Sequence, residues 1–249
     1  MFCCCRSRET AKDSLSTARE TRADSQSLDE PFVPLDRLEM TAPTCPRCAL
    51  PLDEPDESSA EHRCPLHGVV APVHSFQLPT PRLARHTALD SRLPLWLPWP
   101  LPHAWVVSGI GYAGNTPTDA RASLVACSGP SPVGGPADLL LIAEEPGVGL
   151  GSRFSGLDRS DAGEEIGEGP SDVKAHVGGH PTPLWCVRRA PAGRAVYAGE
   201  ADGRWLWLIF YPETAGVLTV EPMTLEDLRD LGHEVDLMPF GDLCPRLAD

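Results

Sequence analysis

Lysine is almost absent from this chain. Its 249 residues include only Lys12 and Lys174, and the 21 lysines and arginines together are outnumbered by 35 aspartates and glutamates. The formal net charge is therefore −14. Such a charge opposes binding to nucleic acid and to anionic membrane surfaces, because both are polyanions. We expect neither as a partner.

Long hydrophobic runs are also lacking. The most apolar stretch, residues 93–107, is interrupted by four prolines and is shorter than the roughly 20 residues that cross a bilayer. Residues 1–8 lack the apolar region of a secretory signal. We therefore predict a cytoplasmic protein with reduced cysteines. The preference for arginine over lysine, with abundant proline, glycine and alanine, suggests a bacterial genome of high GC content.

Familiar catalytic motifs are missing as well. The glycine-rich run Gly147–Gly151 lacks the third glycine of a dinucleotide loop, and we expect a turn with no helix after it. Cys127 and Ser128 are not framed by the glycines of a nucleophile elbow. We interpret them as a core thiol and a turn serine, and we predict no catalytic and no cofactor-binding residues beyond metal ligands.

A second candidate metal site consists of His176, His180 and Cys186. The two histidines would need one helix face to bind together, and Gly178 with Gly179 between them excludes that helix. We therefore do not predict a metal there.

Two short knuckles are the most specific feature that is present. Cys45 and Cys48 are separated by two residues, fifteen residues follow, and Cys64 and His67 are again separated by two. Each spacing lets a tight turn aim both side chains at one ion, so that two turns supply a tetrahedral set. We predict a structural zinc. The alternatives are reduced or disulfide-linked cysteines, or a catalytic zinc, which is disfavoured because no ligand position is left open.

The residue after each knuckle should adopt a left-handed conformation. Gly68 suits this position in the second knuckle, because glycine tolerates positive φ. Ala49 occupies the matching place in the first knuckle, so we expect backbone strain there.

The loop between the knuckles is acidic. Arg47 and Arg63 are the only arginines of this region, and they are outnumbered by five carboxylates: Asp53, Glu54, Asp56, Glu57 and Glu61. A ribbon that binds DNA or RNA needs cations for phosphate contacts. This one would repel phosphate, so we expect a protein as its partner.

The chain divides into three parts by composition. Residues 1–39 are polar and aperiodic, with an odd triplet of cysteines at 3–5, and we expect a disordered leader and translation that begins at Met40. Residues 40–75 form the zinc ribbon, which is too short to fold without its metal. Residues 76–249 form the larger domain.

The larger domain should be an α+β fold with a mainly antiparallel, β-rich sheet and two short helices. Thr80 and Pro81 begin one helix that runs to about Asp90. Thr224 caps the second, which Gly232 ends, and 234–238 returns as a strand. Apolar runs predict strands at 105–112, 122–128, 138–144, 172–177, 184–187, 194–198 and 205–211. The last run is apolar throughout, so it should be central and buried on both faces.

Two segments of the larger domain have no regular pattern. Residues 95–102 alternate apolar residues with prolines, which favours an extended strap across a sheet, with an aromatic peptide-binding groove as the alternative. Residues 155–172 form an acidic, glycine-rich loop that we expect to be disordered.

Several short motifs occur in a fixed order along the chain. They are Cys-Pro-Arg-Cys at 45–48, Cys-Pro-Leu-His-Gly at 64–68, Leu-Pro-Trp-Pro-Leu-Pro at 97–102, Ala-Cys-Ser-Gly-Pro at 126–130, Gly-Val-Gly-Leu-Gly at 147–151, Pro-Thr-Pro-Leu-Trp at 181–185, Pro-Glu-Thr-Ala-Gly at 212–216 and Asp-Leu-Arg-Asp at 227–230. Because it contains these motifs in this order, the chain from Pro43 to Leu247 resembles an uncharacterised actinobacterial family with an N-terminal zinc ribbon. The resemblance implies the architecture and no activity, and Ala49 and the acidic insertion depart from it.

Two functions fit these observations. The first is a non-enzymatic zinc-ribbon protein that acts as a protein-interaction or scaffold module, with the ribbon docked on the β-rich domain or on a partner. The alternative is a small-ligand-binding or hydrolytic enzyme with a pocket within residues 95–216. That pocket would need two or more carboxylates to converge with His176 or His103. The candidates are Glu144, Glu145, Glu200 and Glu213.

Overall fold

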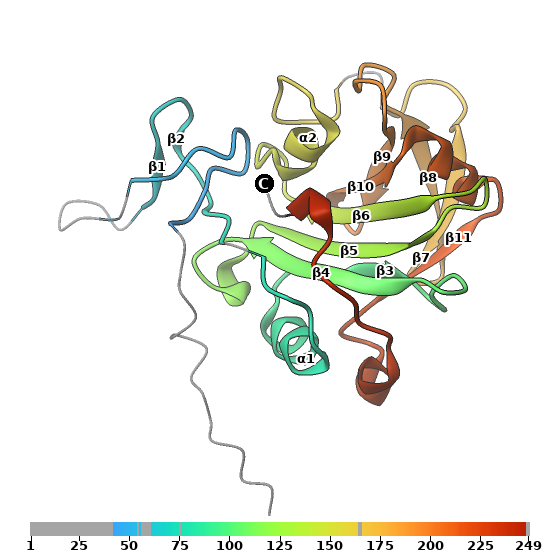
Figure 1. Cartoon of the computed structure of the whole chain (residues 1–249). Coiled ribbons are helices and arrows are strands. Elements are labelled where there is room, and N and C mark those ends of the chain that lie inside the picture. Colours follow the sequence, from blue (N-terminus) through green and yellow to red (C-terminus); the bar gives the residue numbers. More distant parts are fainter. Residues whose placement is uncertain (1–41, 54, 56–60, 75, 164–165, 248–249) are drawn as a thin grey trace, which may run out of the picture. The chain divides into compact units, whose positions relative to one another are not determined.

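The computed structural model describes residues 42–53, 55, 61–74, 76–163 and 166–247, all within one compact unit of the chain, Leu38–Asp249 (Figure 1). The predicted leader lies outside these residues. The strands are β1 Arg63–Cys64, β2 Gly68–Val69, β3 Trp96–Pro98, β4 Val106–Ala113, β5 Ala122–Pro130, β6 Pro136–Glu144, β7 Val173–Val177, β8 His180–Cys186, β9 Ala195–Ala201, β10 Arg204–Tyr211 and β11 Met223–Asp227. The helices are α1 Pro81–Asp90 and α2 Leu150–Ser155, with short 3-10 helices at Pro117–Asp119, Glu213–Thr219, Gly232–Leu237 and Pro245–Leu247.

Nine strands form one curled sheet in the order β3-β11-β7-β8-β9-β10-β6-β5-β4, and β1 and β2 form a separate hairpin. Neighbouring strands of the large sheet are antiparallel except for β11 and β7, which are parallel. The predicted fold class is therefore confirmed: an α+β protein with a mainly antiparallel sheet and few short helices.

The centre of the sheet is buried on both faces. Alternate residues of β5, β6 and β10 enter two different hydrophobic clusters, so that Leu206 and Leu208 pack on one face while Trp207 and Ile209 pack on the other. Helix α1 contributes to the first cluster, and α2 and the C-terminal segment contribute to the second. Strand β10, between β9 and β6, confirms the predicted central strand at 205–211.

Helix α1 has the expected boundaries. The Thr80 side chain accepts a hydrogen bond of 3.1 Å from the Leu83 backbone N–H, Pro81 occupies the first turn, and the helix ends at Asp90. This is the pattern of a capped helix start. Within the described residues, the structure has no helix both long and apolar enough to cross a membrane.

The helix predicted after Thr224 is wrong. Residues Met223–Asp227 instead form β11, which inserts between β3 and β7. Leu225 and Asp227 are buried while Thr224 is exposed, so the chain follows a period of two here. Sheet pairing on both sides outweighs the local capping signal, because propensity is weak compared with tertiary contacts. The strand predicted at 234–238 is also wrong, since Gly232–Leu237 is a 3-10 helix.

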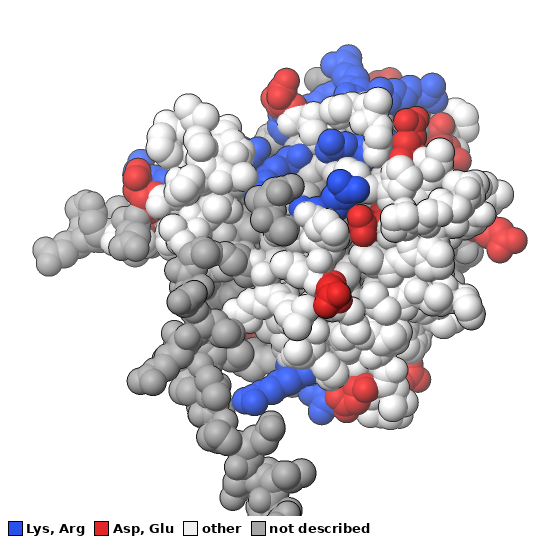
Figure 2. All heavy atoms as spheres, in the orientation of Figure 1, with Lys and Arg blue, Asp and Glu red and all other residues white. Residues whose placement is uncertain are grey.

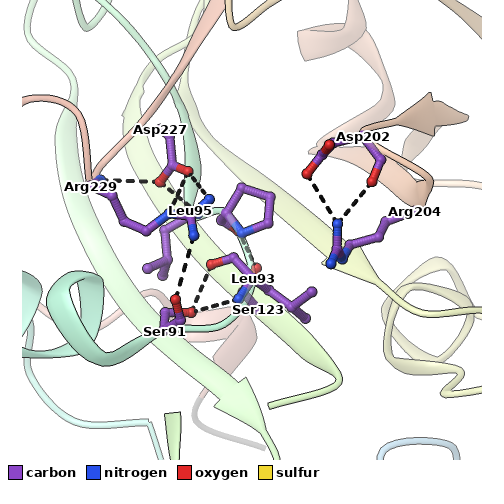
Figure 3. Close-up of polar contacts among 9 residues, drawn as sticks. Ser91, Leu93, Leu95, Ser123, Asp202, Arg204, Asp227 and Arg229 are labelled. Carbon is purple, nitrogen blue, oxygen red and sulfur yellow. Dashed lines mark hydrogen bonds and ion pairs between the residues drawn. The ribbon is translucent and has the colours of Figure 1, made fainter. Parts of the chain in front are cut away.

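A buried carboxylate fixes the turn after β11. Asp227 is 3 % exposed, accepts hydrogen bonds of 3.1 Å from the backbone N–H groups of Leu95 and Arg229, and pairs with the Arg229 guanidinium at 2.6 Å (Figure 3). Arg229 Nη1 also donates to the Ser91 carbonyl oxygen at 3.5 Å. The Asp-Leu-Arg-Asp motif therefore ties β11 to the segment that leads into β3.

A second helix does follow the glycine-rich run, contrary to the expectation for residues 147–151. Gly147 and Gly149 adopt positive φ of 83° and 89°, and α2 begins at Leu150. The helix has only six residues and contains Gly151, so sequence pattern alone gave no sign of it. It is held by its neighbours, since Gly151 lies against the Trp207 indole.

The segment 155–172, expected to be disordered, begins inside α2, and its described residues make specific contacts. Asp161 Oδ1 accepts a 2.8 Å hydrogen bond from the Gly147 N–H, and Asp172 Oδ2 accepts one of 2.9 Å from Cys186. Ala162 is fully buried. These contacts tie the segment to the rest of the domain at Asp161 and at its last residue, Asp172.

Candidate metal centre

The two knuckles bring four potential ligands together. One ligand atom from each of Cys45, Cys48, Cys64 and His67 lies within 4.8 Å of the other three. The Cys48 and Cys64 sulfurs are 3.6 Å apart. His67 Nδ1 lies 3.5 Å from both the Cys45 and the Cys64 sulfur. Among the residues that the structure describes, this is the one group of three or more such side chains that is close enough to hold a metal ion.

These separations fit a tetrahedral zinc. Ligands at about 2.3 Å for sulfur and about 2.0–2.1 Å for nitrogen would place sulfurs about 3.8 Å apart and sulfur and nitrogen about 3.5 Å apart. The cysteines are free thiols and not disulfides. Three thiolates and one imidazole form a donor set that suits zinc and leaves no position for water. The residues present therefore fit the predicted metal.

Backbone hydrogen bonds close the first knuckle. The Ala49 N–H donates to the Cys45 oxygen at 3.0 Å, and the Cys45 N–H donates to the Leu50 oxygen at 2.8 Å. Ala49 has a φ of 60°, the left-handed conformation that was expected here. This conformation is costly for alanine, so the turn stores strain at the position where the second knuckle has glycine.

The second knuckle is the turn of the β1–β2 hairpin. Cys64 lies opposite Gly68, and Arg63 lies opposite Val69. Gly68 has a φ of 70°, as predicted, and it returns the chain after His67. Cys45 and Cys64 are almost completely buried, whereas Cys48 and His67 are half-buried.

The surroundings of the buried thiols differ. Burial raises the pKa of Cys45 to about 11, against the opposing effect of hydrogen bonds from the Arg47 and Cys48 backbone. Burial also acts to raise the pKa of Cys64, but hydrogen bonds from the Leu66 backbone and from His67 outweigh it and lower that pKa to about 6. Backbone N–H groups directed at sulfur favour the thiolate form that a metal requires.

Arg47 anchors the ribbon to the sheet domain. Lying between the two ligands of the first knuckle, it donates from Nε to the Val148 oxygen at 3.3 Å and from Nη2 to the Gly147 oxygen. A Cβ at Gly149 would collide with the Arg47 side chain. The arginine therefore requires glycine in the loop before α2. Sequence reasoning missed this role, because nothing local marks a contact across a hundred residues.

A second arginine brings positive charge to the cluster. Burial lowers the pKa of Arg153 in α2, while the nearby sulfurs of Cys45 and Cys48 act to raise it. With a divalent ion bound to three thiolates, the cluster would carry a net charge of −1, and a guanidinium beside it would compensate that charge.

Glu144 is a buried carboxylate that caps α2. It is fully buried at the end of β6 and accepts hydrogen bonds from the Leu150 N–H at 2.7 Å and the Gly151 N–H at 3.3 Å. Burial raises its pKa to about 7, although these bonds act to lower it. The Trp207 indole N–H also attracts the carboxylate, but its geometry falls short of a hydrogen bond.

The other candidate carboxylates lie in separate surroundings. Glu145 pairs with Arg92 and Arg121 at 2.9 Å each. Glu200 and Glu213 are exposed. Two surface hollows of the described structure contain none of the four glutamates.

The structure does not assemble the second candidate metal site, which consists of His176, His180 and Cys186. His176 and His180 are exposed on the β7–β8 hairpin, and Cys186 lies at the far end of β8.

Cys127 is completely buried, and burial raises its pKa to about 12. It is a core thiol, as predicted.

The proline-rich strap lies at the sheet edge. Trp96–Pro98 is β3, and it pairs with β11. Trp105 is buried, and its indole N–H donates to the Pro130 oxygen at 3.1 Å. The following residues line an open hollow: Trp99, Leu101, Pro102, His103, Ala104, Trp105, Val106 and Pro239. The segment is extended, as expected, but Trp96–Pro98 is an edge strand of the sheet itself and not a strap laid across it.

The fold and the cluster define the class: a β-rich α+β protein with a Cys3His set of potential metal ligands. More particularly, the chain belongs to a family of unknown function (DUF6758), whose model matches residues 40–247. No curated protein matches the chain. No solved structure matches it either.

Proposed function

We propose that this chain is a non-enzymatic protein-interaction module in which a structural zinc, held by Cys45, Cys48, Cys64 and His67, folds an N-terminal ribbon. The observation that carries the proposal is the geometry of these four side chains. Their separations match a closed tetrahedral site, and no ligand position remains for a substrate or a water molecule. In this role the zinc supplies folding free energy and no chemistry.

The docking of the ribbon supports the same function. Arg47 joins the metal cluster to the loop before α2, so the zinc would hold the ribbon in a fixed orientation on the sheet domain. An acidic ribbon of this kind disfavours nucleic acid and membranes, and a protein partner is left as the natural ligand. The alternative, an enzyme with a pocket within 95–216, gains no support because its four glutamates have separate surroundings.

The test separates structural from catalytic zinc. The protein purified without added metal should contain about one zinc per chain. After replacement of zinc by cobalt, the visible absorption bands should indicate a tetrahedral, thiolate-rich site and should not change when azide is added. A zinc content far below one per chain would contradict the metal assignment. Bands that shift with azide would reveal an open position and favour a catalytic site.

A further inference from the structure

The three cysteines of the metal cluster differ in their access to solvent. Cys45 and Cys64 are 0 % and 3 % exposed, whereas Cys48 is half-buried and is the least covered of the three. Oxidation of a cysteine depends on its thiolate character and on its access to the oxidant. A bound metal would hold all three sulfurs as thiolates, so exposure decides among them. Cys48 is therefore the sulfur that a dissolved oxidant reaches first.

A second sulfur lies beside that of Cys48. The Cys48 and Cys64 sulfurs are 3.6 Å apart. An S–S bond is about 2.05 Å long, so a shift of roughly 1.5 Å would join them. Cysteines that respond to oxidants often stand next to such a partner, which converts the oxidised sulfur to a disulfide. The two knuckles thus bring an accessible sulfur and its resolving sulfur into one cluster.

Arg153 of α2 supplies positive charge near the accessible sulfur. The sulfurs of Cys45 and Cys48 act to raise the pKa of Arg153, which reflects their closeness to its guanidinium. Figure 2 shows basic side chains gathered over the part of the molecule where Figure 1 labels α2. When a thiolate attacks a peroxide, negative charge moves from the sulfur to the departing oxygen. A nearby cation stabilises this charge, so Arg153 favours attack by a sulfur of the first knuckle.

We propose that Cys48 is an oxidation site, at which hydrogen peroxide forms a disulfide between Cys48 and Cys64 and thereby releases the metal. The Cys48 thiolate attacks one peroxide oxygen, the O–O bond breaks, and the departing hydroxide takes a proton to become water. The Cys64 thiolate then attacks the oxidised Cys48 sulfur. An S–S bond replaces the S–O bond, and a second hydroxide leaves and takes a proton. The two thiolates together lose two electrons, and the peroxide is reduced to two molecules of water.

The disulfide would release the ribbon from the sheet domain. Only Cys45 and His67 would remain as ligands, and two ligands do not complete a tetrahedral site. Loss of the metal would unfold the ribbon and withdraw Arg47 from the Val148 oxygen. A thiol reductant with added zinc should reverse the change. This inference rests on the proposed function, because it needs a zinc held by the same four side chains.

The test follows zinc release from the zinc-loaded full chain as hydrogen peroxide is added. We expect about one zinc released for each disulfide between Cys48 and Cys64, identified by mass spectrometry of peptides. Among the cysteines of the cluster, dimedone should label Cys48 first. The matched variant is Cys48→His, which gives the first knuckle the cysteine–histidine pattern of the second and leaves a Cys2His2 set that binds zinc. It should release zinc roughly tenfold more slowly, or slower still.

Controls make the outcomes distinct. Cys186→Ser removes a half-buried cysteine outside the cluster, and it should leave the rate of zinc release unchanged. Release from Cys48→His at the wild-type rate, or zinc release that accompanies a disulfide without Cys48, overturns the inference while the proposed function stands. If Cys48→His binds no zinc, the order of dimedone labelling in the wild type decides, and a first label on Cys45 or Cys64 overturns the inference. Absence of zinc from the natively purified protein overturns the proposed function instead.

Discussion

The Nε atom of Arg47 donates a hydrogen bond of 3.3 Å to the backbone oxygen of Val148, 101 residues further along the chain. Arg47 stands between two of the four candidate metal ligands, and Val148 lies in the loop that leads into α2. The Arg47 side chain therefore joins the first knuckle to the sheet domain. The first prediction concerns this contact.

Arg47→Ala should loosen the ribbon without removing the metal. The substitution deletes the hydrogen bonds to Gly147 and Val148, and we expect a loss of about 1–3 kcal/mol in the free energy of unfolding. Hydrogen exchange should accelerate in the ribbon and in the loop before α2. Arg63→Ala, a change of an exposed arginine in the same ribbon, is the matched control. Equal effects of the two variants would show that Arg47 has no docking role.

Cys64→Ser should remove the zinc and unfold the ribbon. Loss of one thiolate from a Cys3His set weakens metal binding severely, and the zinc supplies folding free energy on the order of 10 kcal/mol to domains of this kind. Metal analysis should give much less than one zinc per chain, and limited proteolysis should cut the ribbon first. Cys186→Ser changes a free cysteine away from the cluster and should retain both the metal and the resistance to protease.

Glu144 should make stability depend on pH. Burial raises its pKa to about 7 in the folded state, from an ordinary value of 4.5, so the folded chain holds the proton more tightly than the unfolded chain. The stability that this proton contributes is complete below about pH 4.5 and is lost as the pH rises through 7. Relative to Glu144→Gln, the wild type should lose on the order of 3 kcal/mol across this window.

Urea unfolding of both proteins at several pH values measures this difference. Glu144→Gln keeps an oxygen that can accept the hydrogen bonds of α2 and carries no charge at any pH. A difference between the two proteins that stays constant from pH 4.5 to pH 8 would contradict the assigned protonation of Glu144.

Asp227→Asn should destabilise the sheet domain more than the loss of a surface ion pair does. The carboxylate is 3 % exposed and paired with Arg229 (Figure 3). Because the Arg229 side chain is 36 % exposed, we expect loss of the charged hydrogen bonds to cost about 1–3 kcal/mol. Asp202→Asn is the control, because Asp202 pairs with Arg204 at 3.0 Å at the surface. Exposed pairs contribute about 0–1 kcal/mol. Thermal unfolding should show a large decrease in Tm for the first variant and a small one for the second.

Local signals predicted much of this fold correctly. The capping threonine at 80 and the proline at 81 defined α1, and the apolar run of 205–211 predicted a central strand that both clusters bury. The knuckles predicted four side chains that the structure brings together. In each case the signal is a spacing or a run of residue types that can be recognised within a short stretch of the chain.

The remaining features depend on contacts between distant residues. Thr224 and Asp227 imitate the start of a helix, but pairing with β3 and β7 makes this segment a strand. Helix α2 is too short to be recognised and is held by Glu144 and Trp207 from other strands. The anchoring role of Arg47 likewise required knowledge of which loop lies opposite it.

The most direct test of the account is X-ray absorption at the zinc edge of the natively purified protein. We predict three sulfur ligands at about 2.3 Å and one nitrogen at about 2.0–2.1 Å, with no oxygen ligand. Zinc bound by oxygen, or the absence of a zinc edge from a folded sample, would contradict the central claim that Cys45, Cys48, Cys64 and His67 form a closed structural site.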